Sequence, residues 1–335
     1  MREESVSSGF VLGLLGYAVS RGADRTALLS AAEIDPRLLA DRDARLPYAR
    51  CVALMHAAKT AINDPALALN FGQAVDVAEI SVVGLIGQAS DTMLEAFEQL
   101  NRYVRLIIDV ELQGEDRFAF RRDPSGLWFT DLRANPNAFP ELTESAFSHI
   151  IAGPRRLGMP NWVKEVHVTH PRPAHAADYE RVFGAPVFFG SDRNAMRMEE
   201  SIVGYPVGRL PRYAFGVLIE HADALISALD ASGTTRGRVE SLLMPILHKG
   251  EANMDAIAAK LGFSRQTLYR SLKAENVTFE QVLDELRHRM ALDYIAARKV
   301  SVNETAYLVG FSDPASFSRA FKRWTGKSPR DYRGG

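Results

Sequence analysis

The most constraining feature of this sequence is a short segment that occurs twice near its C-terminal end. Residues 257–273 read IAAKLGFSRQTLYRSLK, and residues 305–322 read TAYLVGFSDPASFSRAFK. The triplet Gly-Phe-Ser begins at Gly262 in the first copy and at Gly310 in the second, an offset of 48 positions. After one inserted residue the basic positions match at an offset of 49: Arg270 with Arg319, and Lys273 with Lys322. Such a repeat predicts one structural unit used twice.

Each copy has the composition of a helix-turn-helix. A glycine can end the first helix, because it adopts the left-handed backbone of a tight exit. A serine, Ser264 or Ser312, is then expected to cap the second helix, and Pro314 suits the first turn of that helix. Residues 301–304 of the second copy form a capping-box pattern. The apolar positions predict two small cores: Ile257, Ala258, Leu261, Phe263, Leu268 and Leu272 in one, and Ala306, Val309, Phe311, Phe317 and Phe321 in the other.

The polar face of each second helix is then free to meet a ligand. Arginine can donate two hydrogen bonds to guanine, glutamine can pair with adenine, and small side chains can meet a thymine methyl group. Lysines and the rear arginines suit phosphates, which fix register. The candidate DNA-binding residues are therefore Arg265, Gln266, Tyr269, Arg270 and Lys273 in the first copy, and Ala315, Ser316, Arg319, Lys322 and Arg323 in the second.

A single helix is predicted between the two copies, over Phe279–Ala297. Its length would be about 28 Å at a rise of 1.5 Å per residue. Successive major grooves on one face of DNA lie about 34 Å apart, so this spacing favours two recognition helices in adjacent grooves. The positions expected to face inward are Val282, Leu283, Leu286, Met290, Ile295 and Ala296.

The distribution of charge supports a nucleic-acid partner for the C-terminal part only. The whole chain has 40 basic and 41 acidic residues, a formal net charge of -1. Residues 236–335 contain 17 basic and 11 acidic residues, whereas the remainder contains 23 and 30. A cationic domain beside an acidic one is the pattern expected when one domain alone meets phosphates.

The preceding part of the chain predicts an α+β domain over residues 1–205. Helical periodicity runs from Phe10 to about Leu106, with a helix that begins after a cap at Ser90 or Asp91. Alternating apolar residues then predict antiparallel strands joined by hairpins, followed by one helix and two further strands. The predicted strands are 107–112, 117–121, 127–132, 165–170 and 184–189, and the helix after the third strand is 141–157.

Two further segments complete the predicted organisation. Residues 206–235 are interpreted as a connecting helix, chiefly 210–230, followed by a linker at 231–235. Residues 236–335 have helical patterns only, so we expect an all-α domain with two helix-turn-helix motifs joined by a connecting helix.

Composition narrows the setting of the protein. Cys51 is the single cysteine and lies in an apolar run, which indicates a buried structural thiol and a reducing, cytoplasmic environment. The first residues lack the cationic lead of a secretory signal, and the apolar run 10–19 is too short to span a membrane. We therefore expect a cytoplasmic protein with no membrane partner.

Other candidate sites are weaker. His167, His170 and His175 are near each other in sequence, but a strand would point the first two to opposite faces, so no metal site is predicted. Arg155 and Arg156 fit either an acidic effector or a solvated helix end, and 199–200 fit either a cationic effector or a surface pair. No phosphate-cradling loop or nucleophile elbow occurs, so neither a cofactor nor an enzymatic activity is predicted.

The C-terminal motifs resemble a known family. Residues 310–313, 317–323 and 326–333 are similar to the signature of AraC/XylS-type transcription regulators, and the resemblance covers about 237–333. It implies that both recognition helices bind double-stranded promoter DNA and that the protein activates transcription by contacting RNA polymerase. Tyr269 and Ala315 occupy positions that vary widely among members, so the operator sequence cannot be transferred.

The N-terminal part resembles a subgroup of this family that carries an arabinose-binding-like effector and dimerisation domain. The matching stretches are 21–24, 64–69, 81–89 and 183–189. The resemblance implies a homodimer and a small-molecule effector, with no basis for choosing a sugar; the residues that bind the effector stay unassigned. Two alternatives remain: a dimeric regulator that needs no ligand, and an enzyme domain fused to a DNA-binding tail.

Overall fold

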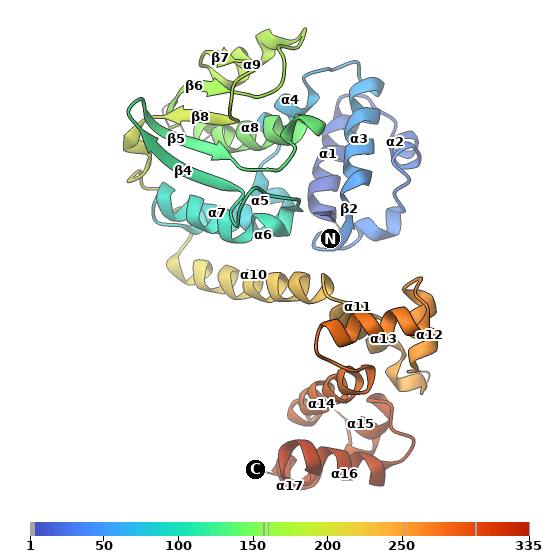
Figure 1. Ribbon diagram of the computed structural model, residues 1–335. Helices are drawn as coiled ribbons and strands as arrows, with labels where there is room; N and C mark the ends of the chain where they lie inside the picture. The colour runs from blue at the N-terminus through green and yellow to red at the C-terminus, as the bar shows by residue number, and fades with distance from the viewer. Residues whose placement is uncertain (1–3, 157, 160, 251, 299, 335) are drawn as a thin grey trace. The chain divides into compact units, whose positions relative to one another are not determined.

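The computed structural model describes residues 4–334 except 157, 160, 251 and 299 (Figure 1). The chain divides into two compact units, Met1–Ile226 and Ser227–Gly335. Each unit has its own buried core.

The first unit begins with a helical layer attached to a small sheet. Val6 of the first strand pairs with Leu46 and with Ile108, so that the central strand of this antiparallel sheet is the first in the sequence. The elements are β1 (Ser5–Ser7), α1 (Ser8–Ser20), α2 (Arg25–Ala31), η1 (Pro36–Leu39), β2 (Arg45–Pro47), α3 (Tyr48–Ala61) and β3 (Ile108–Asp109). The strand β2 lies in the region predicted to be helical, and β1 precedes that region. Neither strand was predicted, because three-residue strands leave almost no alternation to detect.

Four helices follow α3 along the chain: α4 (Leu67–Ala74), α5 (Val77–Ile80), α6 (Val82–Ala89) and α7 (Met93–Ile107). A fifth helix, α8 (Glu141–Arg156), comes between strands of the main sheet. The predicted cap of α7 was wrong. Thr92 caps the helix by accepting from the N–H of Glu95 at 3.2 Å. The Ser90 hydroxyl instead donates to the carbonyl of Ile86, and the backbone N–H of Asp91 donates to the Glu95 carboxylate.

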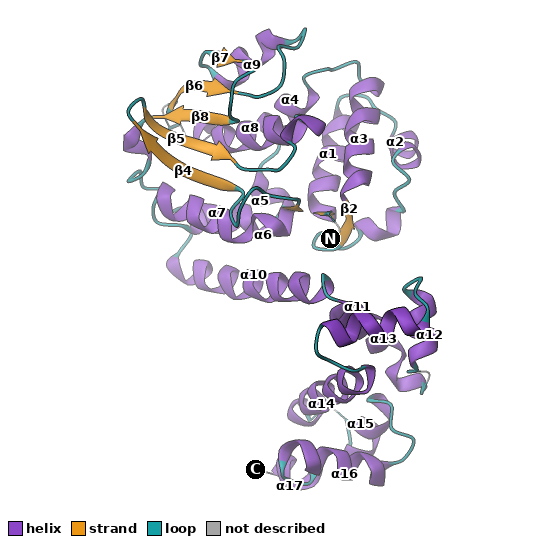
Figure 2. Ribbon diagram, viewed as in Figure 1, coloured by secondary structure: helices purple, strands orange, loops and turns teal. Residues whose placement is uncertain are grey.

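The main sheet has five strands in the order β4-β5-β8-β6-β7, with only the last pair parallel. Its strands are β4 (Phe118–Asp123), β5 (Gly126–Asp131), β6 (Val163–His167), β7 (Val187–Phe188) and β8 (Ala195–Met198). Phe120 pairs with Phe129 across the β4–β5 hairpin, and both rings contact Phe97 of α7. Phe147 of α8 also contacts Phe129, so α7 and α8 cover one face of the sheet (Figure 2).

The predicted α+β character of the first unit is confirmed, with corrections to several strands. Residues 107–112 do not form a hairpin with the next strand, because Ile108 pairs with β1, which is distant in sequence. The predicted strand 165–170 is observed at Val163–His167, and 184–189 shortens to Val187–Phe188. The buried strand β8 was not predicted, and neither was the helix α9 (Ala176–Phe183); short 3-10 turns occur at η2 (Pro136–Ala138) and η3 (Glu200–Ile202).

The helix α10 (Arg212–Ser232) contains the residues at which the two units divide. Ala222 and Leu229 are buried on its predicted apolar stripe, and Tyr103 donates a hydrogen bond to Asp223 at 2.6 Å. The predicted linker 231–235 is mostly helical instead, because α10 continues to Ser232 and the next helix begins at Thr235.

Among the described residues of the second unit there are only helices (Figure 2). They are α11 (Thr235–Leu243), η4 (Met244–Lys249), α12 (Met254–Lys260), α13 (Arg265–Ala274), α14 (Phe279–Ala297), α15 (Val302–Leu308), α16 (Pro314–Thr325) and α17 (Pro329–Gly334). The helix predicted between the copies coincides with α14, although Ala296 is exposed rather than inward. One core forms around the first copy and another around the second, and Met290 of α14 packs against both.

None of the helices in the described part of the chain is long and apolar enough to cross a membrane.

Candidate nucleic-acid interface

The first copy of the repeat is a helix-turn-helix made of α12 and α13. Gly262 has a φ of +70°, the left-handed conformation that the turn requires. The Ser264 hydroxyl accepts from the N–H of Thr267 at 3.1 Å and caps α13, as predicted. Leu268 and Leu272 are buried in the core of this copy, so the opposite face of α13 is directed outward.

All five predicted DNA-binding residues of α13 are exposed: Arg265, Gln266, Tyr269, Arg270 and Lys273. Tyr269 is 53% exposed, which is high for an aromatic side chain, and its ring lies 6.0 Å from the Lys273 ammonium. The Arg265 guanidinium pairs with Asp255 on the preceding helix. The face therefore presents three cationic side chains, one amide and one aromatic ring to solvent.

The second copy is formed by α15 and α16 and differs in its cap. Asp313, rather than the predicted Ser312, accepts from the N–H of Ser316 at 2.8 Å. This hydrogen bond makes the largest contribution to lowering the pKa of Asp313. The capping residue Asp313 lies 49 positions after Ser264. The one extra residue of the second copy therefore falls immediately before its cap. The predicted capping box of α15 is confirmed, with hydrogen bonds in both directions between Ser301 and Glu304.

The predicted residues of α16 occupy less uniform surroundings. Ala315, Arg319 and Lys322 are exposed, and Ser316 is half-buried and accepts a hydrogen bond from Arg319 at 2.9 Å. Arg323 is exposed but pairs with Asp284 of α14 at 2.6 Å. Arg323 therefore lies beside the connecting helix, a placement that the sequence pattern did not indicate.

The connecting helix and the η4 turn join the two copies directly. Arg287 of α14 donates to the carbonyl of Gly310 at 2.9 Å, and its guanidinium lies 4.9 Å from the Phe311 ring. Gly310 has a φ of +81°, and a Cβ atom there would lie 2.6 Å from the Leu247 carbonyl oxygen. Only glycine therefore fits at this contact, which attaches the second copy to the segment that precedes the first.

A group of ion pairs supports the same junction. Glu240 of α11 accepts from Arg236 at 2.9 Å and from Arg289 of α14 at 2.6 Å. Burial alone would raise the pKa of Glu240, but the hydrogen bonds from the two arginines outweigh it and lower the pKa. Figure 1 shows α14 between α13 and α16, and the ion pair of Arg289 with Glu240 attaches α14 to α11.

The three histidines that lie close together in sequence each contact other side chains or the backbone. His167 lies 3.3 Å from a carboxylate oxygen of Glu165, while the Nδ1 atom of His170 lies 2.9 Å from the Pro171 carbonyl. No group of three potential metal ligands occurs among the described residues. These histidines contribute to packing, as in the ring contact between His175 and Tyr179.

The charged pairs considered as effector contacts also have partners. Arg155 donates to the carbonyls of Val182 and Phe183, and Arg156 pairs with Asp76 at 3.3 Å. The two glutamates pair with basic side chains, Glu199 with Lys164 and Glu200 with Arg122.

Comparison with known proteins agrees with this architecture. Residues 22–207 match the family described as the arabinose-binding domain of AraC transcription regulators, N-terminal part. Residues 257–335 match a helix-turn-helix domain family.

Similar proteins extend over nearly the whole chain. The ornithine utilization regulator of Pseudomonas aeruginosa is 28% identical and aligns with 98% of this chain and 96% of its own length. The regulator VirS of Mycobacterium tuberculosis is 23% identical, with 93% and 91% covered. The crystal structure of the regulator CdpR from P. aeruginosa is 23% identical with a TM-score of 0.42, covering 92% of this chain and 96% of that one. The chain belongs to the AraC-type transcription regulators that carry an arabinose-binding-like N-terminal domain.

Proposed function

We propose that the protein is a homodimeric transcription activator that reads promoter DNA with α13 and α16 in successive major grooves. The observation that carries this proposal is the exposure of equivalent basic residues on two capped helices, Arg270 and Lys273 in one and Arg319 and Lys322 in the other. Because both helices are attached to α14, their spacing is fixed before DNA binds.

The individual roles follow from side-chain chemistry. Arg270, Arg319 and Gln266 are assigned to base edges, because their planar groups form paired hydrogen bonds. Lys273, Lys322 and Arg265 are assigned to phosphates, which give affinity without sequence preference. Tyr269 and Ala315 are assigned to apolar contacts with bases, and Ser316 orients Arg319 through their hydrogen bond. Arg323 reaches a phosphate only if it leaves Asp284.

The remaining parts of the proposal rest on the family. Members contact RNA polymerase, dimerise and respond to a small-molecule effector through the N-terminal domain, and we propose the same for this chain, in the cytoplasm. Effector binding would change how the two protomers present their DNA-binding units to paired half-sites. No catalytic step is needed for this role.

The direct test compares arginines with a lysine in a DNA-binding titration. Arg270→Ala and Arg319→Ala should each weaken binding to a selected site by about 1–3 kcal/mol and relax base preference. Lys322→Ala should weaken all sequences alike and reduce the salt dependence. Arg25→Ala, on the exposed surface of α2, is the control and should change nothing. Equal losses on random and selected DNA for both arginines would refute base reading.

A further inference from the structure

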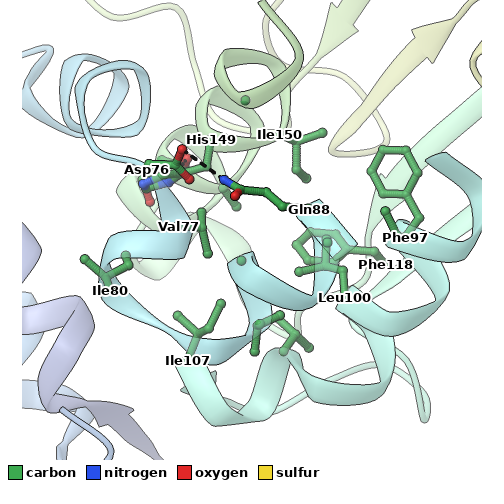
Figure 3. A pocket seen from close by; sticks show the side chains of 18 of the residues that line it. Asp76, Val77, Ile80, Gln88, Phe97, Leu100, Ile107, Phe118, His149 and Ile150 are labelled. Atoms are coloured by element: carbon green, nitrogen blue, oxygen red, sulfur yellow. Dashed lines mark hydrogen bonds between the residues drawn. The ribbon is translucent and has the colours of Figure 1, made fainter. Parts of the chain in front are cut away.

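The first unit contains a pocket of about 200 Å³ that is lined mainly by residues of α5, α6, α7, β4 and α8. Most of its lining is apolar, and Figure 3 shows Phe97, Leu100, Ile107, Phe118 and Ile150 around it. A monosaccharide would leave most of its hydroxyl groups without hydrogen-bond partners in such a pocket, at a cost of about 1–3 kcal/mol for each unpaired group. The lining therefore suits a ligand with an apolar body.

The polar groups at one end of the pocket are an ion pair and a histidine, whose buried Nε2 atom has no hydrogen-bond partner among the described residues. Asp76 accepts a hydrogen bond from Gln88 at 3.3 Å, which Figure 3 marks, and pairs with Arg156 at the same distance. His149 donates through Nδ1 to the Ser145 carbonyl at 2.7 Å, and burial lowers the pKa of His149 to about 4. This end therefore carries a balanced ion pair and a neutral imidazole at pH 7.

Arg117 in the pocket wall is different. Its side chain is 4% exposed, and its Nε and Nη2 atoms have no hydrogen-bond partner among the residues that the structure describes. Its ion-pair partner Asp131 lies 3.6 Å away and also pairs with Arg133 at 3.3 Å. Two buried guanidinium groups thus share one carboxylate, and the Arg117 guanidinium also lies 4.8 Å from the centre of the Phe118 ring. Within the described part of the chain, two positive charges at this place face one negative charge. Such an excess of buried positive charge is costly unless an anion neutralises it.

We propose that this pocket is the effector site and that it binds an apolar carboxylic acid, with the carboxylate on Arg117 and the hydrocarbon body against the apolar wall. The inference rests on the proposed effector role of the N-terminal domain. Arginine is the side chain best suited to a carboxylate, because its two parallel N–H groups match the two oxygens. The open space beside Gly87 and Gly153, two glycines of the lining, leaves room for the body of the ligand.

The test is calorimetric titration of the full chain, without DNA, with decanoate and 2-naphthoate and with their neutral counterparts decan-1-ol and 2-naphthamide. We expect at least one acid to bind tenfold or more tightly than its neutral counterpart, and L-arabinose to give no heat of binding. Equal affinity of both acids and their neutral counterparts would overturn the carboxylate assignment. An absence of binding by all four would overturn the proposal.

Variants locate the binding site. Gly87→Leu should reduce the affinity of the acid at least tenfold, because Gly87 lines the pocket and a Cβ atom there meets no other atom within 4 Å. Gly16→Leu, on an exposed face of α1 with equally open space, is the matched control and should bind normally. Arg117→Met, once thermal unfolding confirms that it folds, should bind acid and neutral compound equally. If Gly87→Leu bound the acid as tightly as the unchanged protein, the assignment of the ligand to this pocket would be wrong. Since DNA is absent, failure here is distinguishable from failure of DNA recognition.

Discussion

In the first helix-turn-helix copy, Gly262 faces open space, whereas in the second copy Gly310 lies against the Leu247 carbonyl. The same sequence triplet therefore has two structural roles. In the first copy the glycine provides only a left-handed turn, but in the second it also allows contact between the two halves of the DNA-binding unit. Arg287, which donates to the Gly310 carbonyl, strengthens that contact.

The exposed faces of the two recognition helices differ in the size of their side chains. The first copy presents large side chains, Gln266 and Tyr269, where the second presents Ala315 and Ser318 at the equivalent positions. Under the proposed function both copies read bases, but only the second is also constrained by an attachment at its turn glycine. Substitutions in the two copies test this difference.

Substituting the two glycines should separate turn geometry from packing. Gly262→Ala should destabilise the protein by about 1–2 kcal/mol, the cost of a left-handed conformation for a side chain with free space. Gly310→Ala should cost about 3 kcal/mol or more, because the new Cβ would also overlap the Leu247 carbonyl. Urea unfolding of the full chain measures both, and equal costs would show that the contact with Leu247 is not maintained in solution.

An exchange at the equivalent positions should move base preference between the two grooves that one protomer contacts. Gln266→Ala should cost about 1–2 kcal/mol at sites with adenine in the first groove and remove the preference for it. Ala315→Gln should create an adenine preference in the second groove. Competition binding with singly substituted sites measures these changes. If Gln266→Ala leaves every base preference intact, the reading role of the first copy is wrong.

The two caps should respond differently to acid. Ser264→Ala should cost about 1 kcal/mol at every pH, because a hydroxyl cap does not titrate. The Ser316 N–H lowers the pKa of Asp313 below its ordinary value of 3.8, so this cap stabilises fully above 3.8 and is lost as the pH falls through the lower, folded value. Asp313→Asn should weaken that acid dependence, as measured by urea midpoints between pH 5 and 3. An unchanged pH profile would rule out Asp313 as the titrating cap.

The smallest effect is expected for the ion pair between Arg323 and Asp284. Both side chains are substantially exposed, at 63% and 43%, so a double-mutant cycle should give a coupling of about 0–1 kcal/mol. Asp284→Ala should cost more than Arg323→Ala, because Asp284 also accepts from the Trp324 indole at 2.8 Å. A coupling above about 2 kcal/mol would mean that the pair is part of the attachment itself.

The sequence was most informative where the physical signal is local. A few neighbouring residues determine where a glycine ends a helix, which side chain caps the next helix and which face is apolar. The helices α13 and α14 and the exposed residues of α13 could therefore be predicted closely. The cap of α16 was displaced by one residue, because Ser312 and Asp313 are both competent caps and only the backbone decides between them.

The features that the sequence did not indicate depend on contacts between distant residues. The pairing of Val6 with Ile108, the contact of Gly310 with Leu247 and the approach of Arg323 to Asp284 join positions from 39 to 102 residues apart. The pocket could not be predicted either. Its lining residues are spread from Phe10 to Val207, so no local sequence pattern marks them.

The central claim is that α13 and α16 read two adjacent grooves on one face of DNA. The direct measurement is a hydroxyl-radical and base-protection footprint of the full chain on a site selected from random DNA, repeated with Arg270→Ala and Arg319→Ala. We predict two protected patches per protomer about 10 base pairs apart, with each variant losing protection in a different patch. A single patch, or the loss of the same bases in both variants, would contradict the claim.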